Sequence, residues 1–144
     1  MSELYSLDIL RLAADAGATA RLESPQVTVE RRSPTCGSRV AVDLILGADG
    51  RVAAFGHEIR ACALGQAAAT LVARNIIGTG LAEIEAARDA LTAYLSGQGE
   101  TLPDWPGVDA LARARPYPAR HPSIRLSIEA AAEAARIAET VERR

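Results

Sequence analysis

The chain has 144 residues, of which 49% are apolar and 3% aromatic, and its formal net charge is −2. This apolar content excludes a disordered chain, and we expect residues 1–144 to form a single domain with a core of Leu, Ile, Val and Ala. The charge provides no global attraction to nucleic acid. No apolar run could span a membrane and the N-terminus does not resemble a signal peptide, so we expect a cytoplasmic protein with neither nucleic-acid nor membrane partners.

The first periodic segment predicts a helix over residues 4–16. Leu4, Leu7 and Leu10 recur at helical spacing, Ser2 can cap the start, and Gly17 ends the pattern.

Three strand patterns follow, over residues 26–32, 39–46 and 51–61. Asp49-Gly50 is a strong hairpin signal between the second and third strands. Three strands joined in order by short turns predict an antiparallel meander.

The remainder of the chain has helical patterns. We predict helices over residues 62–77, 81–96 and about 122–141, with one or two helical turns at 108–114. The expected fold class is α+β, with a small three-stranded antiparallel sheet packed on one face by helices.

The two cysteines fall at related places in this pattern. Cys36 lies between the first two strands, and Cys62 lies where the third strand gives way to a helix. A meander places both at the same end of the sheet. Thiols in the cytoplasm stay reduced, and the N–H groups at a helix N-terminus stabilise a thiolate, which soft metals and persulfide chemistry require. The alternative is a pair of small buried apolar residues.

This arrangement resembles the iron–sulfur cluster assembly scaffold family that includes IscU, SufU and the N-terminal domain of NifU. The similar features are Cys36-Gly37, a strand, a Gly-rich hairpin, Phe55-Gly56, and Cys62 leading into an Ala/Leu helix. The resemblance covers nearly the whole chain, and the stretch 98–116 looks like the insertion of the SufU branch. It implies the fold expected above and a protein that is not an enzyme.

The resemblance also implies a ligand set that is incomplete here. The family's third cysteine falls on Ser123 and its acidic ligand on Ser38, and a serine hydroxyl, protonated near neutral pH, is a poor ligand for a soft metal. We therefore expect Cys36 and Cys62 as ligands and His121, close to the Ser123 position, as the third. Ser38 and Ser123 are lesser candidates that also suit a turn and a helix start, and His121 also suits a capping or surface role.

The implied function is a scaffold that binds iron, zinc or a transient iron–sulfur cluster, or accepts sulfur, and passes it on. The implied partners are a cysteine desulfurase and iron–sulfur recipient proteins, with a homodimer as a further option. Two alternatives stay open: a docking or regulatory module that holds no metal, and a sulfur-relay enzyme using Cys62. A docking patch for an acidic partner is predicted from the arginines near the site, which also suit a solvated surface: Arg113, Arg115, Arg120 and Arg125.

His57 alternates with Phe55 and Ile59 in the third predicted strand. We expect it to be a structural or surface residue on the sheet face opposite Cys62.

Overall fold

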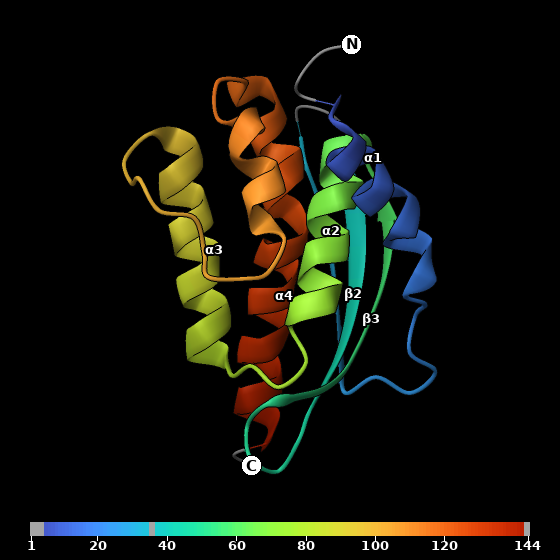
Figure 1. Cartoon of the computed structure of the whole chain (residues 1–144). Coiled ribbons are helices and arrows are strands. Elements are labelled where there is room, and N and C mark those ends of the chain that lie inside the picture. The colour runs from blue at the N-terminus through green and yellow to red at the C-terminus, as the bar shows by residue number, and fades with distance from the viewer. Residues whose placement is uncertain (1–4, 35–36, 143–144) are drawn as a thin grey trace.

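The computed structural model of the chain describes residues 5–34 and 37–142 (Figure 1). The predicted helix residues Ser2 and Leu4 and the candidate ligand Cys36 lie outside these ranges.

Three strands form one antiparallel sheet in the order β1-β2-β3. They are β1 (Val27–Arg32), β2 (Arg39–Leu46) and β3 (Val52–Arg60). The predicted meander is confirmed, and each strand boundary lies within one residue of its predicted place.

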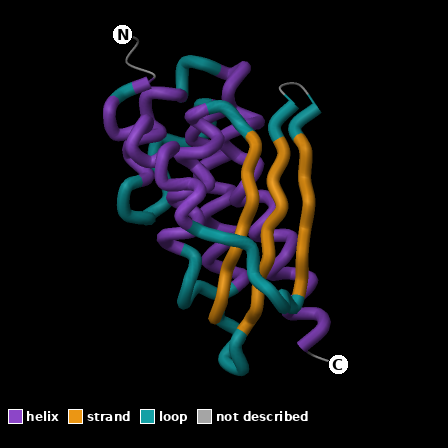
Figure 2. The backbone as a smooth tube through the Cα atoms, turned by 90° about the vertical axis from the view of Figure 1, so that its right-hand side faces the viewer, coloured by secondary structure: helices purple, strands orange, loops and turns teal. Residues whose placement is uncertain are grey.

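The helices are α1 (Leu7–Ala14), α2 (Ala63–Asn75), α3 (Leu81–Ser96) and α4 (His121–Glu142), with 3₁₀ turns η2 (Asp15–Ala18), η3 (Val108–Ala114) and η4 (Pro118–Arg120). Helix α4 packs on β1 and β2, and α2 lies beside it and contacts β3. Helix α1 packs on α2, and α3 packs on α4. The helices lie on one side of the three strands (Figure 2), which confirms the predicted α+β class.

The buried side of α1 differs from the prediction. The helix begins after Ser6, whose Oγ accepts a hydrogen bond from the Ile9 N–H at 3.3 Å. Ile9 and Leu12 are buried, whereas Leu7 and Leu10 are exposed. The predicted stripe is wrong at these two leucines because α1 is apolar on more than one side, and packing on α2 selects the side with Ile9 and Leu12.

The helix-packed face of the sheet also carries His57. The residue paired with it on β2 is Val42, which is fully buried, and His57 itself is 3% exposed. Its Nε2 donates to the Ala16 carbonyl oxygen at 2.8 Å, and burial lowers the pKa of the ring, partly opposed by this bond. The expected structural role is confirmed by this burial, and His57 shares the face of Phe55. The expected placement opposite Cys62 is wrong, because Cys62 lies beyond the end of β3, where strand alternation no longer applies, and its Sγ lies on the helix side beside Ser123.

The opposite face of the sheet is crossed by the connection between η2 and β1. It is held there by Asp43, whose carboxylate is fully buried in the middle of β2. The carboxylate accepts bonds from Arg21 Nε at 2.6 Å, Arg21 Nη2 at 3.0 Å, the Leu22 N–H at 3.0 Å and Thr28 Oγ1 at 2.6 Å. A buried charge with four donors is compensated, so this one side chain ties the connection to the sheet.

Gly56 lies beneath the same crossing. A Cβ atom at this position would lie 2.5 Å from the Ala20 carbonyl oxygen and 2.8 Å from the Leu22 nitrogen. Only glycine permits this close approach of the backbone, which explains why a glycine follows Phe55.

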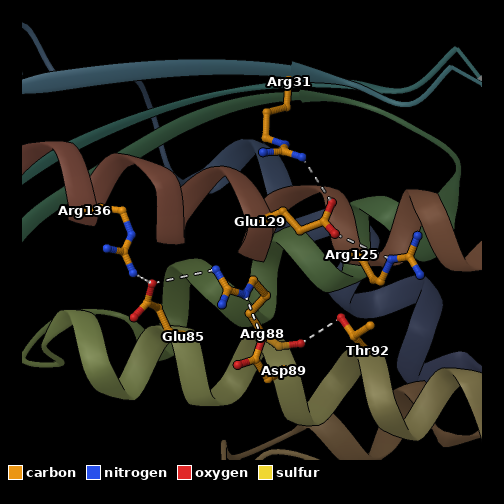
Figure 3. A network of polar contacts seen from close by, with 8 residues as sticks. All are labelled: Arg31, Glu85, Arg88, Asp89, Thr92, Arg125, Glu129 and Arg136. Carbon is orange, nitrogen blue, oxygen red and sulfur yellow. Dashed lines mark hydrogen bonds and ion pairs between the residues drawn. The ribbon is translucent and has the colours of Figure 1, made fainter. Parts of the chain in front are cut away.

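A belt of ion pairs joins β1, α4 and α3 (Figure 3). Arg31 contacts Glu133 at 2.9 Å and Glu129 at 3.8 Å. Glu85 of α3 binds Arg136 of α4. These pairs are partly exposed, so they align α3 and α4 more than they stabilise the fold. Within the described ranges, no helix combines the length and apolar character needed to cross a membrane.

We predict that Asp43→Asn lowers the free energy of unfolding by about 3 kcal/mol at neutral pH, because the Arg21, Thr28 and Leu22 donors lose a buried charged acceptor. Burial raises the pKa of Asp43, but the bonds from Arg21, Thr28 and Leu22 outweigh it, and the pKa lies below the ordinary value of 3.8. A group with a depressed folded pKa stabilises fully above its unfolded value and loses this contribution as pH falls through the folded value.

Denaturant titrations from pH 7 down to below 3.8 test this. The wild type should lose stability over the acid part of this range more steeply than Asp43→Asn. Asp109→Asn, at an exposed aspartate, serves as the control and should behave like the wild type. Equal acid sensitivity of the wild type and Asp43→Asn would contradict the assigned role.

Candidate functional site

Cys62 stands at the junction of β3 and α2. It is the N-cap residue of α2, with extended backbone angles (φ −65°, ψ 171°), and its side chain does not cap the helix. Its Sγ instead lies 3.5 Å from Oγ of Ser123, in the first turn of α4. The half-buried thiol is therefore directed toward the start of α4.

Ser123 connects Cys62 to Ser38. The two serine Oγ atoms are 3.1 Å apart, and the residues are 2% and 4% exposed. Ser38 ends the β1–β2 loop, which the Ser33 N–H closes with a 2.8 Å bond to the Ser38 carbonyl oxygen. Side chains from the β1–β2 loop, α2 and α4 thus meet at one end of the sheet, although up to 85 residues separate them in sequence.

Either atom could be the donor in the Ser38–Ser123 contact and in the Ser123–Cys62 contact. A thiolate can only accept, so a thiolate at Cys62 would accept a hydrogen bond from Ser123. The contacts therefore offer the sulfur a hydroxyl donor.

Gly65 makes the meeting of α2 and α4 sterically feasible. A Cβ atom here would lie 2.5 Å from Ser123 Oγ and 2.6 Å from the Ala61 Cβ. We did not predict a role for Gly65 from the sequence. The available signal was a glycine inside a helix, which costs about 1 kcal/mol relative to alanine and so points to a packing requirement.

The imidazole of His121 is bonded to the backbone of η3. This histidine is the first residue of α4 and 7% exposed, and its Nε2 donates to the Ala114 carbonyl oxygen at 2.9 Å. With Nε2 donating to this carbonyl, Nδ1 is the ring nitrogen that could bind a metal, and the role of His121 as third ligand stays a prediction. Residues 5–34 and 37–142 contain no group of three or more His, Cys, Asp or Glu side chains placed to hold an ion. These ranges do not include Cys36.

The four arginines of the predicted docking patch differ in their contacts. Arg115 pairs with Glu100 at 3.2 Å and lies 4.6 Å from the Tyr94 ring centre. Arg125 lies beside Glu129 (Figure 3), with its Nε 3.7 Å from Oε2 of Glu129. The other two, Arg113 and Arg120, are exposed and form no ion pair with the described residues. Partner binding by this patch stays a prediction.

The fold and sequence together identify the family. The crystal structure of the N-terminal part of a nitrogen-fixing NifU-like protein from Brucella abortus is similar to this chain, with a TM-score of 0.89 and 36% sequence identity over 96% of each chain. The chain belongs to the iron–sulfur cluster assembly scaffold family of IscU, SufU and the NifU N-terminal domain.

Two more distant structures share the scaffold fold. One is an iron–sulfur cluster assembly scaffold protein of the SUF system from Fervidobacterium islandicum AW-1, with a TM-score of 0.81 and 18% identity over 92% of this chain and 96% of that one. The other is a hypothetical protein with a TM-score of 0.68 and 19% identity over 89% and 96%. No family model and no curated protein matches the sequence.

We predict that Gly65→Ala destabilises this scaffold-family chain by about 1–2 kcal/mol, since overpacking against Ser123 exceeds the gain in helix propensity. Denaturant unfolding measures the effect. Gly17→Ala is the matched control, because a Cβ there meets nothing within 4 Å, and it should be neutral or stabilising. A Gly65→Ala protein as stable as the wild type would refute the close contact between α2 and α4.

Proposed function

We propose that the chain acts as a scaffold-like protein in iron–sulfur cluster assembly, using Cys36 and Cys62 to accept sulfur or to hold iron, zinc or a transient cluster as cargo. The observation that carries the proposal is the contact of Ser38, Ser123 and Cys62. These are positions at which the family resemblance predicts ligands, and they meet in a chain of that family.

Sulfur acceptance needs only one of the thiols. The Cys62 thiolate attacks the outer sulfur of a donor persulfide, the donor's S–S bond breaks, and the donor leaves as a thiolate while Cys62 becomes a persulfide. The Ser123 hydroxyl, 3.5 Å from Sγ, stabilises the attacking thiolate by donating to it. No external oxidant or reductant is consumed, because the sulfane sulfur is only transferred.

Holding a metal demands more ligands than the described residues supply. They bring one thiol and two hydroxyls to the site, and a neutral hydroxyl binds iron or zinc poorly. Cys36 would supply a second thiolate. The remaining ligands would come from Nδ1 of His121, from a partner's cysteine, or from a second copy of the chain. Such a site favours short residence and transfer over storage.

The alternative function is a docking or regulatory module that holds no metal. It is supported by the Ser38–Ser123 pair, because two of the family's ligand positions are hydroxyls bonded to each other in the core. In either role we propose a cytoplasmic protein without enzymatic activity, with a cysteine desulfurase and iron–sulfur recipients as partners. Arg113 and Arg120 remain candidates for contact with them.

Anaerobic purification without added metal, followed by analysis of iron, zinc and sulfide, separates the two functions. We expect near-stoichiometric metal in the wild type and loss of most of it in Cys36→Ser and in Cys62→Ser, with melting temperatures close to the wild-type value. Desulfurase-dependent transfer of labelled sulfur should depend on Cys62 in the same way.

A wild type that carries neither metal nor labelled sulfur would contradict the proposal. If the Cys36→Ala/Cys62→Ala protein also bound a desulfurase as the wild type does, the docking function would replace it.

A further inference from the structure

Three arginines occupy one row across the outer face of the sheet. In the strand register Arg32 is directly opposite Arg39, and Arg39 is directly opposite Arg60. Residues opposite one another in an antiparallel pair have Cβ atoms about 5 Å apart, so three positive charges start within about 10 Å. Like charges in this position repel and weaken the pairing. The row therefore lowers the stability of the isolated chain unless an anion neutralises it.

The three arginines form no ion pair within the described part of the chain. All three side chains are exposed, and none forms an ion pair or hydrogen bond with another residue of the described ranges that would account for its charge. The neighbouring Arg31 shows the contrast: it points to the helix side and pairs with Glu133 at 2.9 Å. Because side chains alternate along a strand, Arg31 faces the helices and has an ion-pair partner, whereas its neighbour Arg32 faces outward and has none among the described residues.

The row borders a depression in the surface. The floor of this depression is Ala41, which lies two positions after Arg39 on the same face of the sheet. Glu30 and Glu58 lie on either side of Ala41. Glu58 lies 3.8 Å from Arg21 on its other side. A small residue between long charged ones leaves room for an incoming side chain beside Arg39.

The row also lies at the base of the candidate site. Arg32 and Arg39 flank the β1–β2 loop, Arg39 directly follows Ser38, and Arg60 is two residues before Cys62. The serine–cysteine contacts are on the helix side of the sheet and the arginines on the outer side. A molecule bound to the row would therefore sit next to the end of the sheet that carries the candidate site, without covering Cys62.

We propose that Arg32, Arg39 and Arg60 form a docking surface for a short acidic segment of a partner protein, with carboxylates on alternating residues. Arginine forks bind carboxylates in a bidentate manner, and alternate side chains of an extended segment lie about 7 Å apart, within reach of a row about 10 Å long. This surface is distinct from the patch around Arg113 and Arg120 and does not depend on metal binding at Cys62.

A nucleic-acid strand fits the surface less well. The basic row is one residue deep, and the next row toward the middle of the sheet carries Glu30 and Glu58, which repel a continuing phosphate backbone. The row and the rows next to it on this face contain no aromatic side chain on which a base could stack. The net charge of −2 adds no long-range attraction.

The test measures binding of a fluorescently labelled peptide of alternating Glu and Ser by anisotropy, at two salt concentrations. We expect salt-sensitive binding by the wild type and about tenfold weaker binding by Arg39→Gln/Arg60→Gln, since two exposed ion pairs are lost. Arg11→Gln/Arg74→Gln removes the same charge from helices on the other side of the sheet and should bind like the wild type. The melting temperature of Arg39→Gln/Arg60→Gln should not fall, because repulsion within the row is relieved.

Three outcomes would overturn the proposal: no peptide binding by the wild type at low salt, equal weakening in both double variants, or tighter binding of a single-stranded oligonucleotide that is lost in Arg39→Gln/Arg60→Gln. Repeating the titration with Cys36→Ser/Cys62→Ser separates this proposal from the scaffold function. Unchanged peptide binding there, together with loss of metal, is expected if both hold.

Discussion

The contact between the first turns of α2 and α4 is the constraint on which the site depends. Gly65 has no side chain, and Ser123 occupies the space where a Cβ would be. This lets Ser123 reach the sulfur of Cys62 on one side and the hydroxyl of Ser38 on the other. Since α4 also covers β1 and β2, the same packing that buries the core fixes the geometry of the site. Core packing and site geometry are therefore not separable in this chain.

The two faces of the sheet have different surroundings, and both contribute to the position of the site. The inner face is mostly apolar and receives the helices, although it also carries His57 and Arg31, which pairs with Glu133 of α4. Most charged strand residues lie on the outer face. Asp43 differs from these because it is fully buried, beneath the connection that Arg21 anchors. With Gly56 it fixes the path of the chain from η2 into β1, and hence the placement of the strand that leads into the β1–β2 loop.

Much of the fold could be predicted from the sequence because its signals are local. Alternating apolar residues, the Asp49-Gly50 turn and glycines at helix ends placed the strands and most helices to within one or two residues. The buried side of α1 could not be predicted in this way, because it depends on which face of α2 is available. The burial of His57 is similar: its bond partner, Ala16, is 41 residues away.

The site was only partly accessible to sequence reasoning. The family resemblance brought Ser38, Ser123 and Cys62 together, and the structure places them in contact. The bond of His121 to Ala114 could not be foreseen, because it requires the coordinates of η3. The arginine row across the sheet was missed because Arg32, Arg39 and Arg60 meet only when the strand register is known.

The described part of the site combines one thiol with two hydroxyls. Ser38 contacts Ser123, and Ser123 contacts Cys62. Neutral hydroxyls are poor ligands for iron and zinc. We propose that Ser123 stands where a third soft ligand would complete a metal site.

Zinc affinity, measured by competition with a chromophoric chelator, tests this most directly. Ser123→Cys should bind zinc at least about tenfold more tightly than the wild type, because it adds a thiolate beside Cys62. Ser127→Cys makes the same change one turn further along α4, at a buried hydroxyl without a partner among the described residues, and should leave the affinity unchanged. Equal affinities in the wild type and both variants would contradict the account.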